Sequence, residues 1–123
     1  MSKKVLIIDD SSTVRQQVGI LLTEAGYEVL QAVDGIDGLS QIRACHELEL
    51  VFCDVHMPNM SGIDMLKALA RDAVKLPPIV MLTTEGNPSS ITQAKEAGAR
   101  GWIVKPVKPE TLLATVRKIA GTP

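Results

Sequence analysis

Short apolar runs alternate with longer segments of helical character five times along the chain, and this alternation restricts the fold more than any other feature. The runs cover residues 5–9, 28–32, 50–54, 79–83 and 101–105. Four of them are rich in Val, Ile and Leu, the composition that a parallel strand buried on both faces requires. The run at 28–32 is more polar and is predicted to be an edge strand. Strands that alternate with helices predict an α/β protein.

Between the runs, apolar residues recur with the three- and four-residue spacing of a helix that is buried on one side. Three such faces are Val14, Val18, Leu21, Leu22 and Ala25; Leu66, Leu69, Ala70 and Ala73; and Leu112, Leu113, Val116, Ile119 and Ala120. Gly26 and Gly98 are predicted to end helices, Pro109 to begin one, and Pro77-Pro78 to stop the third. Right-handed crossovers then predict a doubly wound parallel sheet, whose strand order the periodicity leaves open.

The length of 123 residues predicts one domain over 1–123. A net charge of -1 without a basic block argues against direct nucleic-acid binding. The apolar run near the N-terminus is too short for a secretion signal or a membrane span, so we expect a cytoplasmic protein with no membrane partner.

Two cysteines and two histidines lie near the middle of the chain: Cys45, His46, Cys53 and His56. Two cysteines are too few for a disulfide framework, and a cytosolic setting would keep them reduced. A zinc site is an alternative, but the paired ligand spacings typical of zinc are missing. We therefore expect these residues to be structural.

Polar residues gather at the ends of the predicted strands. Asp9 and Asp10 end the first, Asp54 the third, Thr83 the fourth and Lys105 the fifth. In an open α/β sheet, the carboxyl ends of the strands form the ligand crevice where the strand order reverses. Carboxylates that converge there repel unless a cation lies between them, and Mg²⁺ suits such oxygen ligands. The lysine and the hydroxyl suggest a phosphoryl group, and a carboxylate can be its nucleophile.

Each of these residues also has a structural interpretation. Asp9 and Asp10, with the two serines that follow, could cap the next helix. Asp54 could stabilise a turn, Thr83 could be an ordinary strand residue, and Lys105 could be solvated at a strand end. Their joint placement at one edge of the sheet favours the functional interpretation.

The motifs at these positions resemble those of response-regulator receiver domains. They are the DD after the first strand, the DVHMPNMSG that begins at Asp54, Thr83, and the KP at 105–106. The resemblance extends from Lys4 to about Ala120. It implies a flavodoxin-like fold with five helices and the strand order 2-1-3-4-5.

The resemblance also implies a role for each acidic residue. Asp54 would accept the phosphoryl group. Asp10 and Asp54 would bind Mg²⁺ directly, Asp9 would assist through water, and the backbone carbonyl of His56 would complete the protein ligands. The protein would be a switch and not an enzyme, because it would catalyse only its own phosphorylation and dephosphorylation.

Further roles follow from the same resemblance. Thr83 and Lys105 would contact the phosphoryl oxygens, and the peptide bond before Pro106 would be cis. Trp102 occupies the position of the switch aromatic, which is usually Tyr or Phe, and would respond to Thr83.

Three positions depart from the family pattern. His56 stands where the chemotaxis protein of enteric bacteria has Asn, and Thr84 replaces a small residue after the switch threonine. Because both would flank the phosphoryl group, we expect them to tune its lifetime. Lys108 stands where Ser or Thr would cap the last helix, so that helix is predicted to lack a side-chain cap.

The chain ends at Pro123, soon after the last predicted helix, so we expect no effector domain and output through a binding partner. Stand-alone receivers of this form are most similar to CheY-like chemotaxis regulators, and the runs MLTTEG and GWIVKPVKPE strengthen the likeness. The likeness implies a chemotaxis-type histidine kinase, a flagellar motor switch protein and a phosphatase as partners of a monomer.

Other functions remain open from the sequence. The receiver could be a phosphate sink or a phosphorelay intermediate instead of a messenger. An aspartyl-phosphate hydrolase would carry a second Asp where His56 stands and a cap domain, which the chain lacks. A receiver-shaped module that binds independently of phosphorylation would have no need to keep all the chemical positions.

Overall fold

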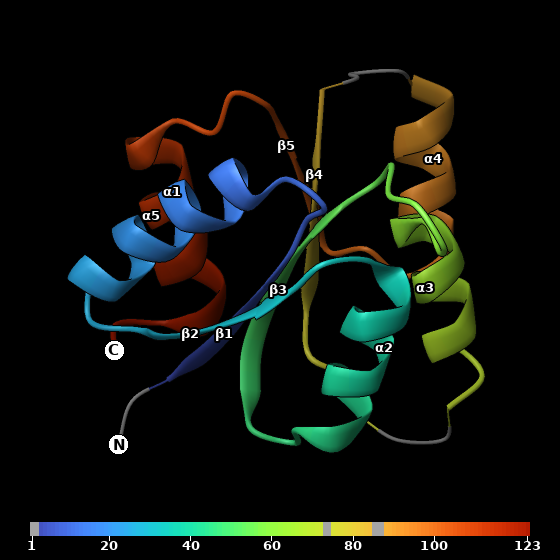
Figure 1. Cartoon of the computed structure of the whole chain (residues 1–123), viewed down its shortest axis with the longest axis horizontal. Helices are drawn as coiled ribbons and strands as arrows, with labels where there is room; N and C mark the ends of the chain where they lie inside the picture. The colour runs from blue at the N-terminus through green and yellow to red at the C-terminus, as the bar shows by residue number, and fades with distance from the viewer. Residues whose placement is uncertain (1–2, 73–74, 85–87) are drawn as a thin grey trace.

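A parallel sheet of five strands in the order β2-β1-β3-β4-β5 organises the structure (Figure 1). The structure is a computed structural model and describes residues 3–72, 75–84 and 88–123. The strands are β1 (Lys4–Ile8), β2 (Glu28–Ala32), β3 (Leu48–Asp54), β4 (Ile79–Thr83) and β5 (Gly101–Val104). The helices are α1 (Ser12–Glu24), α2 (Gly35–Ala44), α3 (Gly62–Leu69), α4 (Pro88–Glu96) and α5 (Pro109–Ala120). The predicted flavodoxin-like fold and strand order are confirmed.

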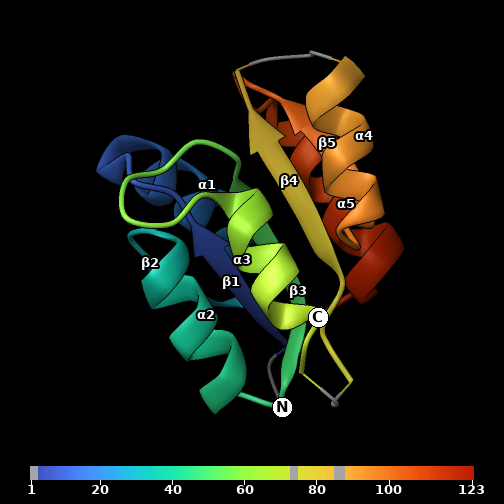
Figure 2. The same ribbon diagram turned by 90° about the vertical axis from the view of Figure 1, so that its right-hand side faces the viewer.

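Helices cover both faces of the sheet, with α1 and α5 on one face and α2, α3 and α4 on the other (Figures 1 and 2). On the first face, Leu22 and Val116 join the core cluster that contains Phe52 of β3. On the second face, Met65 and Leu69 join the cluster that contains Met81. Apolar burial on both faces of the central strands is the main source of stability for such a sheet.

All five runs form strands, and the predicted placement of the strand as buried or at an edge holds for four of them. β2 lies at the edge of the sheet, as its polar composition predicts. The prediction that 101–105 is a buried strand is wrong, because β5 is the opposite edge. Only Ile103 of β5 is buried, and Val104 is 49% exposed. A short apolar run does not reveal whether a neighbouring strand lies on each side of it.

Most helix boundaries agree with the sequence signals. Ser11 is the N-cap of α1 and accepts a hydrogen bond from the backbone N–H of Val14. Gly26 and Gly98 follow α1 and α4 with φ of 100° and 111°, in the left-handed region that favours glycine at a helix end. Pro109 begins α5, and the N-cap Lys108 makes no side-chain cap, as predicted.

The third helix ends earlier than its apolar face suggests. α3 stops at Leu69, and Ala70 is its C-cap and is exposed. Ala73 lies outside the described residues, as do Glu85 and Gly86 of the MLTTEG run. Among the described residues, no helix has the length and apolar character needed to cross a bilayer.

Candidate functional site

The predicted site residues lie together at the carboxyl edge of the sheet. Asp9 directly follows β1, Asp54 ends β3, Thr83 ends β4, and Lys105 directly follows β5. β1 and β3 are adjacent, and their following helices, α1 and α3, lie on opposite faces (Figure 1). The side chains therefore surround the point where the connections diverge, which is the usual ligand crevice of such sheets.

Three carboxylates form the centre of the site. One oxygen from each of Asp9, Asp10 and Asp54 lies within 4.8 Å of the others, and the described residues contain no other such group of acidic, histidine or cysteine ligands. Asp9 and Asp54 are buried, whereas Asp10 is exposed. Oxygen donors around a half-open space suit a hard divalent cation that keeps several waters. Such a cation would also offset the repulsion between like charges.

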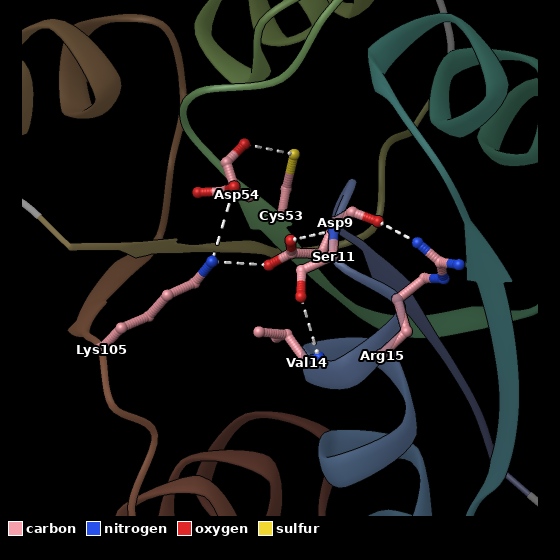
Figure 3. Close-up of polar contacts among 7 residues, drawn as sticks. All are labelled: Asp9, Ser11, Val14, Arg15, Cys53, Asp54 and Lys105. Atoms are coloured by element: carbon pink, nitrogen blue, oxygen red, sulfur yellow. Dashed lines mark hydrogen bonds and ion pairs between the residues drawn. The ribbon is translucent and has the colours of Figure 1, made fainter.

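Lys105 places an ammonium group against two of the carboxylates (Figure 3). Its Nζ lies 2.7 Å from Asp9 Oδ2 and 3.5 Å from Asp54 Oδ2, and its side chain is 14% exposed. Burial opposes the charged ammonium, but the hydrogen bond to Asp9 and the charge of Asp54 outweigh it and raise the pKa of Lys105. The Lys105–Pro106 peptide bond at this corner is cis.

Asp54 lies in surroundings that disfavour its charge. Burial raises the pKa of this carboxyl, and the negative charge of Asp9 raises it further. The ammonium of Lys105 and the backbone N–H of Val55 oppose this shift. A bound divalent cation would favour the ionised form, so cation binding and Asp54 ionisation are coupled.

Asp9 is fixed by contacts to four of its polar atoms. Its backbone N–H donates to Ala32 of β2 (3.1 Å), and its Oδ1 accepts from the backbone N–H of Ser11 (2.9 Å). Its Oδ2 accepts from Lys105, and its carbonyl oxygen accepts from Arg15 Nη1 at 2.6 Å. Ser11 is the residue that caps α1, and not Asp9 or Asp10. The carboxylate of Asp10 lies in the acidic cluster instead.

Arg15 was missed by the sequence reasoning. The available signal was its place in the first turn of a helix, where the macrodipole disfavours a cation. Because Arg15 does not stabilise the first turn of α1, its side chain is expected to have another role.

Thr83 and Trp102 lie on the neighbouring strands β4 and β5. Thr83 is buried and pairs in register with Val104, and Met81 pairs with Trp102. The half-buried Trp102 packs against the core cluster on the α4 face. Its indole nitrogen is buried and has no hydrogen-bond partner among the described residues. Thr84 is exposed beside the site.

The loop between β3 and α3 carries His56, which is exposed. Asn59 has φ of 68°, and its side-chain amide donates to Asp34 Oδ2 at 2.8 Å. A side chain at Gly62 would collide with the carbonyl oxygen of Asp54, so only glycine fits this close approach. These contacts shape the loop that follows Asp54.

The cysteines and histidines do not form a zinc site. Cys45 is the C-cap of α2, whereas Cys53 is buried in β3 and its thiol donates to the carbonyl oxygen of Asp54 at 3.2 Å. Burial raises the pKa of the Cys53 thiol well above its usual range. No three ligand atoms of Cys45, His46, Cys53 and His56 come together in the described structure.

Comparisons with known proteins agree with this geometry. The family model described as "Response regulator receiver domain" matches residues 5–117. The chain is 36% identical over 121 residues to "Chemotaxis protein CheY1" of Helicobacter pylori, which covers 97% of this chain and 98% of that protein. It is 33% identical to "Chemotaxis protein CheY homolog" of Campylobacter jejuni, with 97% and 93% covered.

Solved structures show the same likeness. Chemotaxis response regulator CheY4 of Vibrio cholerae superposes with a TM-score of 0.88 at 42% identity, over 97% of this chain and 99% of that one. A putative response regulator from Chloroflexus aurantiacus superposes with the same TM-score at 34% identity, over 98% of each chain. The chain therefore belongs to the family of response regulator receiver domains.

Proposed function

We propose that this receiver is a chemotaxis response regulator that accepts a phosphoryl group from a histidine kinase on Asp54. One observation carries the proposal: Asp54 ends the central strand β3 beside two further carboxylates and the ammonium of Lys105. This set offers a nucleophile, ligands for a divalent cation and a positive charge for phosphoryl oxygens.

Each residue has a distinct part in the transfer. An oxygen of Asp54 attacks the phosphorus of a phosphohistidine and forms the new O–P bond. The N–P bond breaks, and the imidazole nitrogen keeps the electron pair and takes up a proton. Lys105 and Thr83 contact the phosphoryl oxygens. Asp10, Asp54 and the backbone carbonyl of His56 would hold Mg²⁺ directly, Asp9 would assist through water, and the ion would supply charge neutralisation.

The switch joins the site to a partner surface. Thr83 ends β4 near the phosphoryl site, and Trp102 lies on the adjoining strand β5. Movement of Thr83 toward the phosphoryl group opens space into which the Trp102 ring shifts. A two-state change of this kind requires that the phosphoryl group contact the two states differently. The face formed by α4, β5 and α5 then changes its affinity for partners.

The chemotaxis role rests on relatives that are named as chemotaxis proteins and are 33–36% identical to this chain. The proposed partners are a chemotaxis-type histidine kinase, a flagellar motor switch protein and a phosphatase. The receiver acts as a cytoplasmic monomer. His56 follows Asp54 by two residues, and Thr84 follows Thr83 at the edge of the site. Both residues therefore set the lifetime of the phosphoryl group.

Intact mass measured after incubation with a small phosphodonor and Mg²⁺ tests the proposal. We expect the wild-type chain to gain one phosphoryl group and Asp54→Asn to gain none. Asp64→Asn is the matched control, because it changes an exposed carboxylate in α3. Stoichiometric labelling of Asp54→Asn, with the label at another residue, would exclude Asp54 as the acceptor.

A further inference from the structure

Arg15 connects α1 to the edge strand β2 and to Asp9, the residue that directly follows β1. Its Nη1 donates to the carbonyl oxygen of Asp9 at 2.6 Å, and its Nε donates to Gln31 Oε1 of β2 at 3.2 Å. Figure 3 shows the side chain turning from α1 toward Asp9. Both acceptors are neutral oxygens, so these contacts fix direction and are not ion pairs.

The position of Arg15 in its helix makes a purely local role a poor explanation. Arg15 lies in the first turn of α1, four residues after the N-cap Ser11. The partial positive charge at a helix N-terminus disfavours a cation there, and this turn contains no acidic residue to compensate. The planar guanidinium can instead serve two acceptors in one fixed geometry, which lysine cannot do.

The contact with Asp9 controls the peptide group that leads into Asp10. The carbonyl that Arg15 holds belongs to the Asp9–Asp10 peptide, whose planarity transmits its orientation to the Cα of Asp10. The side chain of Asp9 is already held by Ser11 and Lys105. Asp10 is the exposed member of the acidic cluster, so its carboxylate depends most on the backbone for its direction.

We infer that Arg15 is a positioning residue for the divalent cation: it orients the Asp9–Asp10 peptide so that the Asp10 carboxylate faces Asp9 and Asp54. The inference rests on the proposed function, since it assigns Mg²⁺ to this cluster. The competing interpretation is that Arg15 only ties α1 to the edge strand through Gln31.

The direction in which Mg²⁺ affinity changes when Arg15 is replaced distinguishes a positioning role from an effect of its charge. A positive group near the cluster repels Mg²⁺, so removal of its charge alone would tighten Mg²⁺ binding. Loss of the orienting hydrogen bond leaves Asp10 free to sample directions away from the cluster, which weakens binding. A variant that keeps the charge and loses the guanidinium geometry isolates the second effect.

Arg15→Lys is that variant, and Arg43→Lys is its matched control. Arg43 makes two hydrogen bonds to Asp72 at 3.1 Å, at an exposed position on α2. We expect calorimetric titration with Mg²⁺ to give an affinity about tenfold lower for Arg15→Lys, equivalent to about 1.4 kcal/mol. Arg43→Lys keeps the wild-type affinity. In the absence of Mg²⁺, the NMR amide signal of Asp10 shifts in Arg15→Lys alone.

Two further variants keep the test decisive. Arg15→Gln removes both the charge and the guanidinium. If Arg15 positions Asp10, this variant binds Mg²⁺ more weakly than the wild-type chain, and tighter binding would overturn the inference. Gln31→Met removes the second acceptor without a change in α1, and we expect a loss of about threefold, in the same direction. Wild-type Mg²⁺ affinity in folded Arg15→Lys, or an equal loss in Arg43→Lys, would also refute the positioning role.

Failure of this inference is distinct from failure of the proposed function. If the wild-type chain is phosphorylated on Asp54 with Mg²⁺ and Arg15→Lys binds Mg²⁺ normally, only the role of Arg15 is wrong. If the wild-type chain binds no Mg²⁺ at this cluster, the proposed cation site is wrong as well.

Discussion

Lys105→Met removes the protein's own cation from the acidic cluster, and we expect it to destabilise the fold when a chelator is present. The ammonium lies 2.7 Å from Asp9 and 3.5 Å from Asp54, both of which are buried. Methionine has a similar length and flexibility, so the substitution mainly removes charge and hydrogen bonds. The two buried carboxylates then face each other without a counter-charge.

The size of the loss follows from opposing contributions. At an effective dielectric constant of about 20, unit charges 3.5 Å apart attract by about 5 kcal/mol. The cost of burying Lys105 offsets part of this attraction. Asp54, whose pKa is already raised, limits the loss further because it can take up a proton. We expect the free energy of unfolding to fall by about 2–3 kcal/mol at neutral pH.

Urea unfolding with a chelator and with saturating Mg²⁺ measures the effect. Lys4→Met is the matched control, since the Lys4–Glu47 ion pair has a distance of 2.9 Å but side chains 30% and 76% exposed. Its loss has little effect on the free energy of unfolding, because water screens an exposed ion pair. Mg²⁺ replaces the missing charge in Lys105→Met. By linkage the variant binds Mg²⁺ about tenfold more tightly, so saturating Mg²⁺ restores about 1.4 kcal/mol of the lost stability. Equal losses in both variants, or no restoration by Mg²⁺, would refute this reasoning.

Three other predictions concern the phosphoryl group, the switch and the buried carboxyl. Thr84→Ala loses the phosphoryl group faster than wild type, because the threonine crowds the attacking water; equal decay of the label would disprove this. Phosphorylation with Mg²⁺ changes Trp102 emission relative to Mg²⁺ alone, and Thr83→Ala blunts the change; unchanged emission and quenching would disprove the coupling. Because the pKa of Asp54 is raised in the fold, its contribution to stability is full at acidic pH and is lost as pH rises. Asp54→Asn is therefore more stable than the wild-type chain at neutral pH in a chelator. Urea unfolding at neutral and at acidic pH should show this difference in the free energy of unfolding at neutral pH and its loss at acidic pH.

The sequence predicts the central strands well, because a strand that is buried on both faces consists mainly of Val, Ile and Leu. The run at 79–83 coincides with β4, which is buried throughout, whereas the more polar run at 28–32 coincides with the edge strand β2. β5 was predicted to be buried because Trp102, Ile103 and Val104 are apolar, yet the sheet ends there. A polar run such as 28–32 indicates an edge strand, but an apolar run does not exclude one, because the whole topology decides which strands have a neighbour on each side.

The site is predictable in outline and not in detail. Strand ends that carry carboxylates predict the cluster, because parallel strands bring their carboxyl ends to one edge. The sequence does not reveal that Lys105 lies closer to Asp9 than to Asp54. The sequence also does not reveal the hydrogen bond from Arg15 to the Asp9 carbonyl oxygen, because every residue has a backbone carbonyl whatever its side chain.

Locating the phosphoryl group at a single residue tests the central claim most directly. Borohydride reduces an aspartyl phosphate to homoserine, and peptide mass analysis then identifies the modified position. After phosphorylation by a histidine kinase with Mg²⁺, we expect homoserine at position 54 in the wild-type chain and none in Asp54→Asn. Homoserine at Asp9 or Asp10, or phosphorylation without any change at Asp54, would contradict the account.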